Sequence, residues 1–295
     1  MQVILRRVKR FVLCMRSVFA GILLLYGSWA IGQHSDRIAS LNETVKALAS
    51  AEKDPVRDSL NAVLKSGLRD LLSTEDAATL SLADLRLSRV DAPDGKFRLI
   101  TWNVPRSDGS HLYEGLLLVV DRSKKRSYEL KDATAAIASP EVPELGPDRW
   151  YGALYYEVVP VKKGGKTYYT LLGWKGFDRI ETQKVIEVLH FKGSAPRFGA
   201  PLFGSGKLKK NRQVFRYSFQ ASMTLRHQPE FGIILDHLSP SRADLEGQWA
   251  FYGPDMSFDA YVWEKGQWQF QRDIDARDRS RSDKPFNAPP PDPKP

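Results

Sequence analysis

The chain has 295 residues, of which 42% are hydrophobic and 27% charged, an ordinary globular balance that allows a substantial core in one large or two small domains. Its formal net charge is +9, but five of the basic side chains lie within the first 32 residues, where no acidic residue occurs. The remainder carries 39 basic and 35 acidic side chains. Because this part lacks the dense basic stripe typical of nucleic-acid-binding proteins, we expect no nucleic-acid partner.

Residues 1–32 have the three parts of a secretory signal peptide: the charged start MQVILRRVKR, the apolar run SVFAGILLLYGSWAIG, and the small-x-small site Ala30-Ile31-Gly32 before Gln33. The alternative is an anchor that is never cleaved. The apolar run from Ser17 to Ile31 has 15 residues, whereas a stable membrane span needs about 20. We therefore favour cleavage, export to the periplasm or beyond, and no stable membrane span afterwards.

The single cysteine, Cys14, precedes the apolar run, so it cannot be the lipidated cysteine of a bacterial lipoprotein, which follows that run. Cleavage would leave a mature chain without a thiol. Disulfides, thiolate metal sites and cysteine nucleophiles are then excluded.

Residues 33–80 are predicted to form a helical hairpin. Ile38, Leu41, Val45 and Leu48 recur at spacings of three and four, which makes one apolar stripe. Asp54-Pro55 is typical of a helix start, with aspartate as the N-cap, and a second apolar stripe continues to about Leu72. We expect this hairpin to pack against the following domain; a coiled contact with a partner is the alternative.

Residues 81–275 change to a period of two, which predicts a mainly β domain built as an antiparallel meander, either a barrel or a sandwich. Turn-rich pieces separate the expected strands. These strands lie in KFRLITWNV, HLYEGLLLVVD, RSYEL, ALYYEVVPVKKGGKTYYTLLGW, KVIEVLHF, QVFRYSF, ASMTLR, FGIILDH, FDAYVW and QWQFQRD. Phe215, Tyr217 and Phe219 should face inward, because they alternate with the polar residues Arg216, Ser218 and Gln220.

Two hairpins can be predicted with their register. A turn at Gly164-Gly165 would pair Val161 with Tyr168 and Val159 with Thr170. A turn at Lys265-Gly266 would pair Trp263 with Trp268, Tyr261 with Phe270, and Asp259 with Arg272. The charged, proline-rich residues 276–295 cannot bury enough apolar surface to fold, so we predict a disordered tail there.

The stretch FQASMTLRHQPEFGIILDHLSP supplies three candidate catalytic residues, Ser222, Asp236 and His237. A serine hydrolase needs its serine within hydrogen-bond reach of a histidine that an acid orients. Asp236 and His237 are neighbours and diverge on a regular strand, whereas Ser222 and His237 meet across the hairpin in one register only. Since the G-x-S-x-G turn of such enzymes is absent, we favour a structural role for these residues.

Other catalytic and metal sites have less support. The histidines lack the H-x-x-x-H spacing, and Asp273, Asp275 and Asp278 resemble a calcium loop without its glycine and distal glutamate, so neither a metal nor a cofactor is expected. Glu187, Asp255 and Asp259 are candidate carboxylates for sugar hydrolysis, but nothing in the sequence sets their separation. Asp255 follows Gly-Pro and is typical of a turn. The GSGK stretch at 204–207 lacks the strand and spacing of a phosphate loop.

Aromatic residues give the positive indication of binding. Trp249 and Tyr252, in the turn-rich GQWAFYGPD, are the candidates for exposed ligand-binding rings. Exposed aromatic rings stack on sugars or anchor protein interfaces. The alternative is that these rings simply belong to a β core, where aromatic residues are enriched.

Five stretches, YYTLLGW, VIEVLHFKGSAPRFGAPLF, YSFQASMTLR, LDHLSP and GQWAFYGPDMSFDAYVW, occur in this order between about residues 151 and 275. Together this region resembles a family of exported bacterial proteins without an established function. The resemblance implies a location in the cell envelope. It implies no catalytic residues.

The sequence therefore predicts an exported, non-enzymatic cell-envelope protein with a binding or structural role, whose partner is a glycan or an envelope protein. One alternative is a secreted hydrolase that acts on glycans or peptides through Asp236 or His237. A second is a subunit of a secretion or surface-assembly machine, which a large apolar patch on the helical hairpin would indicate.

Overall fold

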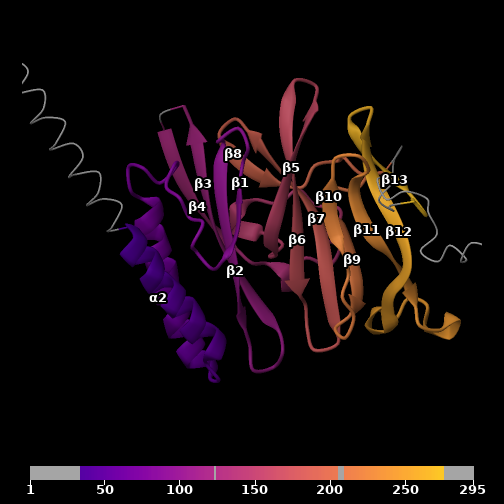
Figure 1. Ribbon diagram of the computed structural model, residues 1–295, viewed down its shortest axis with the longest axis horizontal. Helices are drawn as coiled ribbons and strands as arrows, with labels where there is room; N and C mark the ends of the chain where they lie inside the picture. Colours follow the sequence, from indigo (N-terminus) through magenta and orange to yellow (C-terminus); the bar gives the residue numbers. More distant parts are fainter. Residues whose placement is uncertain (1–33, 123, 205–208, 276–295) are drawn as a thin grey trace, which may run out of the picture.

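The computed structural model describes residues 34–122, 124–204 and 209–275. The expected signal peptide, Cys14, the proline-rich tail and most of the GSGK stretch lie outside the described residues. The described chain forms two helices followed by antiparallel sheets, so the predicted mainly β fold with an N-terminal helical hairpin is confirmed (Figure 1). The strands of this part of the chain belong to open sheets, and no closed barrel is seen among them.

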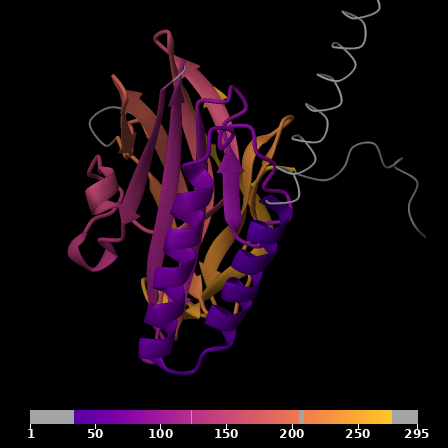
Figure 2. The ribbon, with the colours of Figure 1, turned by 90° about the vertical axis from the view of Figure 1, so that its left-hand side faces the viewer.

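The helical hairpin consists of a helix over residues 34–50 and α2 (Asp54–Leu72). Figure 2 shows both helices side by side across one face of the first sheet. The predicted stripes are buried there, with Leu64 and Leu68 fully inaccessible beside Trp102 and Leu116 of the sheet. One detail is corrected, since the N-cap of α2 is Lys53.

Asp54 is instead the first residue of α2, and its carboxylate accepts hydrogen bonds from Ser107 and Arg57. Towards solvent α2 exposes Val56 and Val63, which lie two turns apart. Two isolated valines are far smaller than the continuous patch that an assembly surface would present. No helix of the described segments is long and apolar enough to span a membrane.

Three sheets follow the helices in layers. The first sheet has the order β1-β2-β3-β4, the middle sheet has β5-β6-β7-β8 with β9 also paired to β7, and the last has β10-β11-β12-β13. The strands of the first sheet are β1 (Ser88–Asp91), β2 (Phe97–Pro105), β3 (His111–Asp121) and β4 (Lys124–Lys131). Those of the middle sheet are β5 (Leu154–Lys163), β6 (Lys166–Gly176), β7 (Glu181–Lys192), β8 (Ala195–Phe198) and β9 (Gln213–Ser218). Those of the last sheet are β10 (Leu225–Gln228), β11 (Gly232–Pro240), β12 (Tyr252–Glu264) and β13 (Gln267–Gln271).

The middle sheet is covered on both faces. One apolar cluster joins it to the first sheet and includes Leu99, Leu117 and Leu171. A second cluster joins its other face to the last sheet and includes Ile186 and Ile233. Because β7 is buried on both sides, its burial pattern is nearly continuous rather than alternating.

The register of both predicted hairpins is confirmed. Val161 lies opposite Tyr168 and Val159 opposite Thr170, and both turn glycines have positive φ angles of 55° and 73°. In the last hairpin Trp263 lies opposite Trp268 and Tyr261 opposite Phe270. The primed turn types that need positive φ match the twist of adjacent strands, which explains this agreement.

Two expectations about side chains are wrong. The ladder of the last hairpin ends at Ala260 and Gln271, and the carboxylate of Asp259 binds His237 instead of Arg272. Phe219 lies just beyond the end of β9, in a turn, and 60% of its surface is exposed. Alternation therefore stops one residue earlier than the sequence pattern indicates.

Candidate binding groove

A hollow of about 450 Å³ lies where the edge strand β9 of the middle sheet meets β11 and β12 of the last sheet. A single 3-10 turn, η4 (Trp249–Phe251), borders it. This volume is within the range of small-molecule sites. Its lining includes Phe215, Arg216, Asp236, His237, Trp249, Tyr252 and Asp259.

Both predicted aromatic candidates line this hollow. The rings of Trp249 and Tyr252 are 4.7 Å apart between centroids and are tilted by 50°. Trp249 is half-buried and Tyr252 is only 8% exposed, so the expectation of two exposed rings is wrong for Tyr252 and too strong for Trp249. Tyr252 is buried because its hydroxyl accepts a hydrogen bond from the backbone N–H of Gly247, 3.0 Å away, which folds the loop over it.

The position of Trp249 is supported by Arg216, which sequence reasoning missed. The guanidinium carbon of Arg216 lies 5.9 Å from the Trp249 ring and 5.8 Å from the Phe177 ring. Two of its nitrogens donate to Oε2 of Glu181 at 2.9 and 2.6 Å. A planar guanidinium held in this way forms a rigid support for the indole. The signal was the polar side of β9, where Arg216 alternates with inward-facing aromatic residues.

His237 and Asp259 form a pair on another wall of the hollow. Nδ1 of His237 lies 2.8 Å from Oδ2 of Asp259, which is 4% exposed. The other oxygen of Asp259 accepts the backbone N–H of Asp273 at 3.1 Å. Nε2 of His237 lies 3.4 Å from a guanidinium nitrogen of Arg272. The imidazole is therefore held on both sides, with its Nε2 directed towards a cation.

The candidate catalytic residues are not brought together as a triad. Leu225 lies opposite Leu235 in the β10–β11 ladder, and continuing this register places Thr224 opposite Asp236. Asp236 accepts the backbone N–H of Thr224 at 2.7 Å, which confirms that placement. Ser222 is exposed, lies in the segment before β10 and is not among the residues that line the hollow. Asp236 and His237 thus line the hollow without Ser222.

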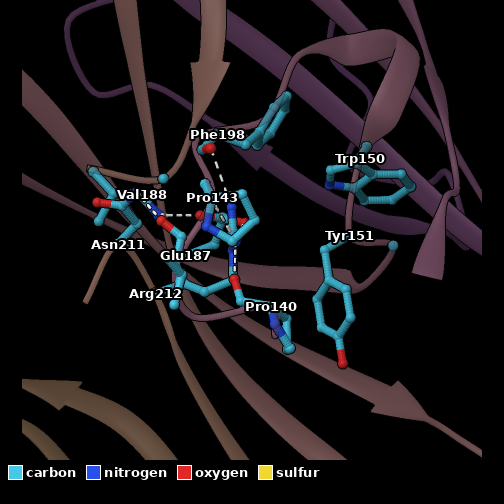
Figure 3. Close-up of polar contacts among 12 residues, drawn as sticks. Pro140, Pro143, Trp150, Tyr151, Glu187, Val188, Phe198, Asn211 and Arg212 are labelled. Atoms are coloured by element: carbon cyan, nitrogen blue, oxygen red, sulfur yellow. Dashed lines mark hydrogen bonds and ion pairs between the residues drawn. The ribbon is translucent and has the colours of Figure 1, made fainter. Parts of the chain in front are cut away.

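Glu187, a candidate carboxylate for sugar hydrolysis, is part of a buried structural ion pair (Figure 3). Neither Glu187 nor Arg212 has any exposed side-chain surface, and Nε of Arg212 donates to Oε2 of Glu187 at 2.7 Å. Burial raises the pKa of Glu187, against the opposing effect of Arg212. A carboxylate enclosed in this way has no access to a substrate.

Lys175 is a second buried charge that the sequence did not indicate. It is 1% exposed, and its ammonium donates to Oγ1 of Thr134 at 2.8 Å and to the carbonyl of Gly152 at 2.6 Å. It also lies 4.0 and 4.7 Å from the ring centroids of Tyr113 and Tyr151. Burial lowers the pKa of Lys175 to about 8. Because its ammonium is fully surrounded by these partners, Lys175 is a structural residue.

The remaining carboxylates have local partners. Oδ1 of Asp255 accepts the backbone N–H and the hydroxyl of Ser257 at 3.1 and 2.7 Å, but the expectation that Asp255 lies in a turn is wrong, since it lies within β12. Among the residues with described positions, no group of three or more histidine, cysteine or acidic side chains could hold a metal ion. Asp278 lies outside the described residues.

Comparisons with known proteins add nothing to this geometry, since no family model, curated protein or solved structure matches the chain. The resemblance to exported bacterial proteins stays a prediction. The candidate site therefore depends on its own chemistry, which is an aromatic wall facing polar side chains within one hollow.

Proposed function

We propose that this chain is an exported, non-enzymatic protein of the cell envelope that binds a glycan in the hollow between β9 and β11. The observation that carries the proposal is the half-buried Trp249, whose ring lies 5.9 Å from the guanidinium carbon of Arg216. It lines the same hollow as Asp236 and His237. A sugar ring has an apolar C–H face and a polar rim. An aromatic ring beside fixed hydrogen-bonding groups complements both.

The charges around the hollow favour an uncharged ligand. Arg216 is bound to Glu181, His237 to Asp259, and Lys210 lies 4.0 Å from Glu141. Each of these cationic or titratable groups therefore has a carboxylate close to it. A polyhydroxylated neutral ligand can use the remaining lone pairs and N–H groups without the desolvation of an unpaired charge. Among the described groups that line the hollow, a polyanion would find no cation without a nearby carboxylate.

The proposed export and envelope location derive from the sequence pattern of residues 1–32, with its charged start, apolar run and small-x-small site. A glycan ligand fits this location because envelope polysaccharides are accessible to an exported protein. Fractionation of cells that produce the full chain, with detection of the cleaved form in the periplasm or medium, tests this part separately.

Binding is tested by isothermal titration of the chain from residue 33 onward with β-1,4-linked oligomers of N-acetylglucosamine, glucose and mannose. At least one series should bind, and Trp249→Ala should weaken binding by at least about tenfold, equivalent to about 1.4 kcal/mol. Trp263→Ala is the matched control, because Trp263 lies on the β12–β13 hairpin outside the lining of the hollow. Failure of all three series, or equal effects of the two substitutions, would overturn the proposal.

A second candidate function is hydrolysis, which the His237–Asp259 pair favours. A carboxylate that orients an imidazole at 2.8 Å is one part of a general-base arrangement, but Nε2, which would accept the proton, would first have to separate from Arg272, 3.4 Å away. Among the described residues no serine, threonine or cysteine lines this hollow, so water is the nucleophile of this candidate. Oligosaccharides and peptides incubated with the protein should then be cleaved, and His237→Gln should abolish cleavage. Intact substrates after prolonged incubation with the wild-type protein would eliminate this candidate.

A further inference from the structure

A second hollow, of about 590 Å³, lies beside the first and shares Tyr252 with it. It is lined by Arg179, Ile180, residues 218–221, residues 239–241 and residues 250–254. Three of its apolar side chains are unusually exposed for their size: Ile180 at 60%, Phe219 at 60% and Phe251 at 47%. Large apolar groups that gather at one hollow are typical of a binding surface.

The two hollows lie end to end along the same segments of the chain. On β9 and the turn after it, residues 214–216 line the first hollow and residues 218–221 line the second. On β11 and beyond, residues 235–238 line the first and residues 239–241 the second. Both segments therefore pass from the first hollow into the second in the same direction. Such an arrangement makes a trough rather than two unrelated pits.

The 3-10 turn η4 places one aromatic ring at each hollow. Trp249 lines the first hollow and Phe251 lines the second. Since a 3-10 helix has three residues per turn, residues i and i+2 point in different directions, whereas residue i+3 returns to the side of residue i. Tyr252 follows Trp249 by three residues, packs against its ring, and borders both hollows. The turn thus presents aromatic groups along the whole trough.

The second hollow also has hydrogen-bonding groups. Ser218, Ser239 and Ser241 line it together with its aromatic residues. Arg179, the charged residue in this lining, donates to the backbone carbonyl of Ser107 at 2.7 Å. Hydroxyl groups beside exposed aromatic rings repeat the chemistry of the first hollow.

We propose that the two hollows form one continuous trough that binds an extended linear glycan, with the first unit on Trp249 and further units on Phe251 and Phe219. This inference rests on the proposed glycan-binding function and adds the class of ligand, a polymer rather than a mono- or disaccharide. Each hollow alone has the volume of a small-molecule site, so a disaccharide would occupy one of them only.

The test is titration with the disaccharide and the hexasaccharide of the three β-1,4-linked series. Wild-type protein should bind the hexasaccharide of one series at least about tenfold more tightly than its disaccharide. Phe251→Ala should reduce the affinity for the hexasaccharide to that for the disaccharide, whereas Trp249→Ala should weaken the binding of both. Met256→Ala is the control, because Met256 is 95% exposed and lies outside the lining of both hollows.

The outcomes separate the trough from the proposed function. Equal affinity for disaccharide and hexasaccharide, or a length gain that survives Phe251→Ala, overturns the trough and leaves glycan binding in place. Binding of a proline-rich peptide in place of every oligosaccharide overturns both. Phe251 is half exposed, so Phe251→Ala should keep the thermal unfolding midpoint of the wild type. An unchanged unfolding midpoint then excludes general damage as the cause of the lost length gain.

Discussion

Replacing Arg212 by methionine should be among the most damaging single substitutions in this protein. Arg212 is fully buried and donates to Oε2 of Glu187 and to the backbone carbonyls of Pro140, Pro143 and Phe198 (Figure 3). Methionine fills a similar volume but has no donor. The substitution therefore leaves a buried carboxylate without its cation and removes the donor of the Pro140 and Pro143 carbonyls, whereas the Phe198 carbonyl keeps the backbone N–H of Leu145 at 2.7 Å.

The magnitude follows from these contacts. Breaking a buried ion pair by removing one partner costs about 3–5 kcal/mol. Each carbonyl that stays buried without a donor adds about 1–3 kcal/mol. Pro140 and Pro143 are only partly buried, so water can reach their carbonyls after a small movement. We therefore expect the free energy of unfolding to fall by about 4–6 kcal/mol, dominated by Glu187.

Glu187→Gln should cost somewhat less, about 3 kcal/mol, because it leaves the buried guanidinium without its counter-ion, although the amide keeps an acceptor for Arg212, which also retains its three carbonyls. Urea unfolding followed by tryptophan fluorescence measures both values. Lys192→Met is the control: Lys192 is 62% exposed in its pair with Glu144, and its loss should cost less than about 1 kcal/mol. If the unfolding free energy of Arg212→Met lay within about 1 kcal/mol of the wild-type value, the conclusion that the buried Arg212–Glu187 pair stabilises the middle sheet would be refuted.

Two further predictions concern stability. Burial lowers the pKa of Lys175 to about 8, so above that pH the folded state binds fewer protons than the unfolded state. The unfolding free energy of the wild type, measured relative to that of Lys175→Met, should therefore rise by about 2 kcal/mol from pH 8 to 9.5. Parallel pH profiles of the two proteins would contradict this. Gly232→Ala should cost at least about 2 kcal/mol, because φ is +84° and the added carbon would lie 2.3 Å from the carbonyl oxygen of Tyr261. Gly253→Ala, whose nearest new contact is 3.6 Å, should change stability by less than about 0.5 kcal/mol, and equal losses in urea unfolding would oppose this explanation.

Local chemistry made the hairpins predictable. Gly164-Gly165 and Lys265-Gly266 adopt positive φ angles, and the residues that flank them pair as alternation requires. The strands β1 (Ser88–Asp91) and β8 (Ala195–Phe198) were missed. Each has four residues, too few for a period of two to be recognised. Each forms by pairing with a longer strand, β1 with β2 and β8 with β7.

The partner of Asp259 was unpredictable for a different reason. In the β11–β12 ladder, Asp236 pairs with Phe258 but Leu238 pairs with Pro254, so the register shifts at His237. A bulge turns side chains away from the face that strict alternation assigns to them. His237 thereby reaches Asp259, which the hairpin pattern alone had paired with Arg272. The extra residues lie on β12, where residues 255–257 face His237 alone, so the regular ladder assumed from the sequence does not hold there.

The groove itself arises from packing between sheets. Periodicity identifies which residues of β9 and β11 point outward, but not that the edge of the middle sheet meets the last sheet beside η4. The sequence therefore indicated Trp249 and Tyr252 through their turn-rich surroundings and missed Arg216, whose role depends on contacts with Glu181 and Trp249. Alternation marks Arg216 as outward-facing, but its contacts with Glu181 and Trp249, which come from distant segments, have no local sequence signal.

The buried Arg212–Glu187 pair is physically connected to the candidate binding groove. Arg212 directly precedes β9 and binds the carbonyls of Pro140 and Pro143, which flank Glu141, a residue that lines the first hollow. Asn211 also holds this loop, since its backbone N–H donates to the carbonyl of Glu141 at 2.7 Å. One buried guanidinium thus fixes both the start of β9 and the loop beside it. A wall held in this way loses little conformational freedom when a ligand binds, so more of the contact energy of Trp249 remains available for affinity.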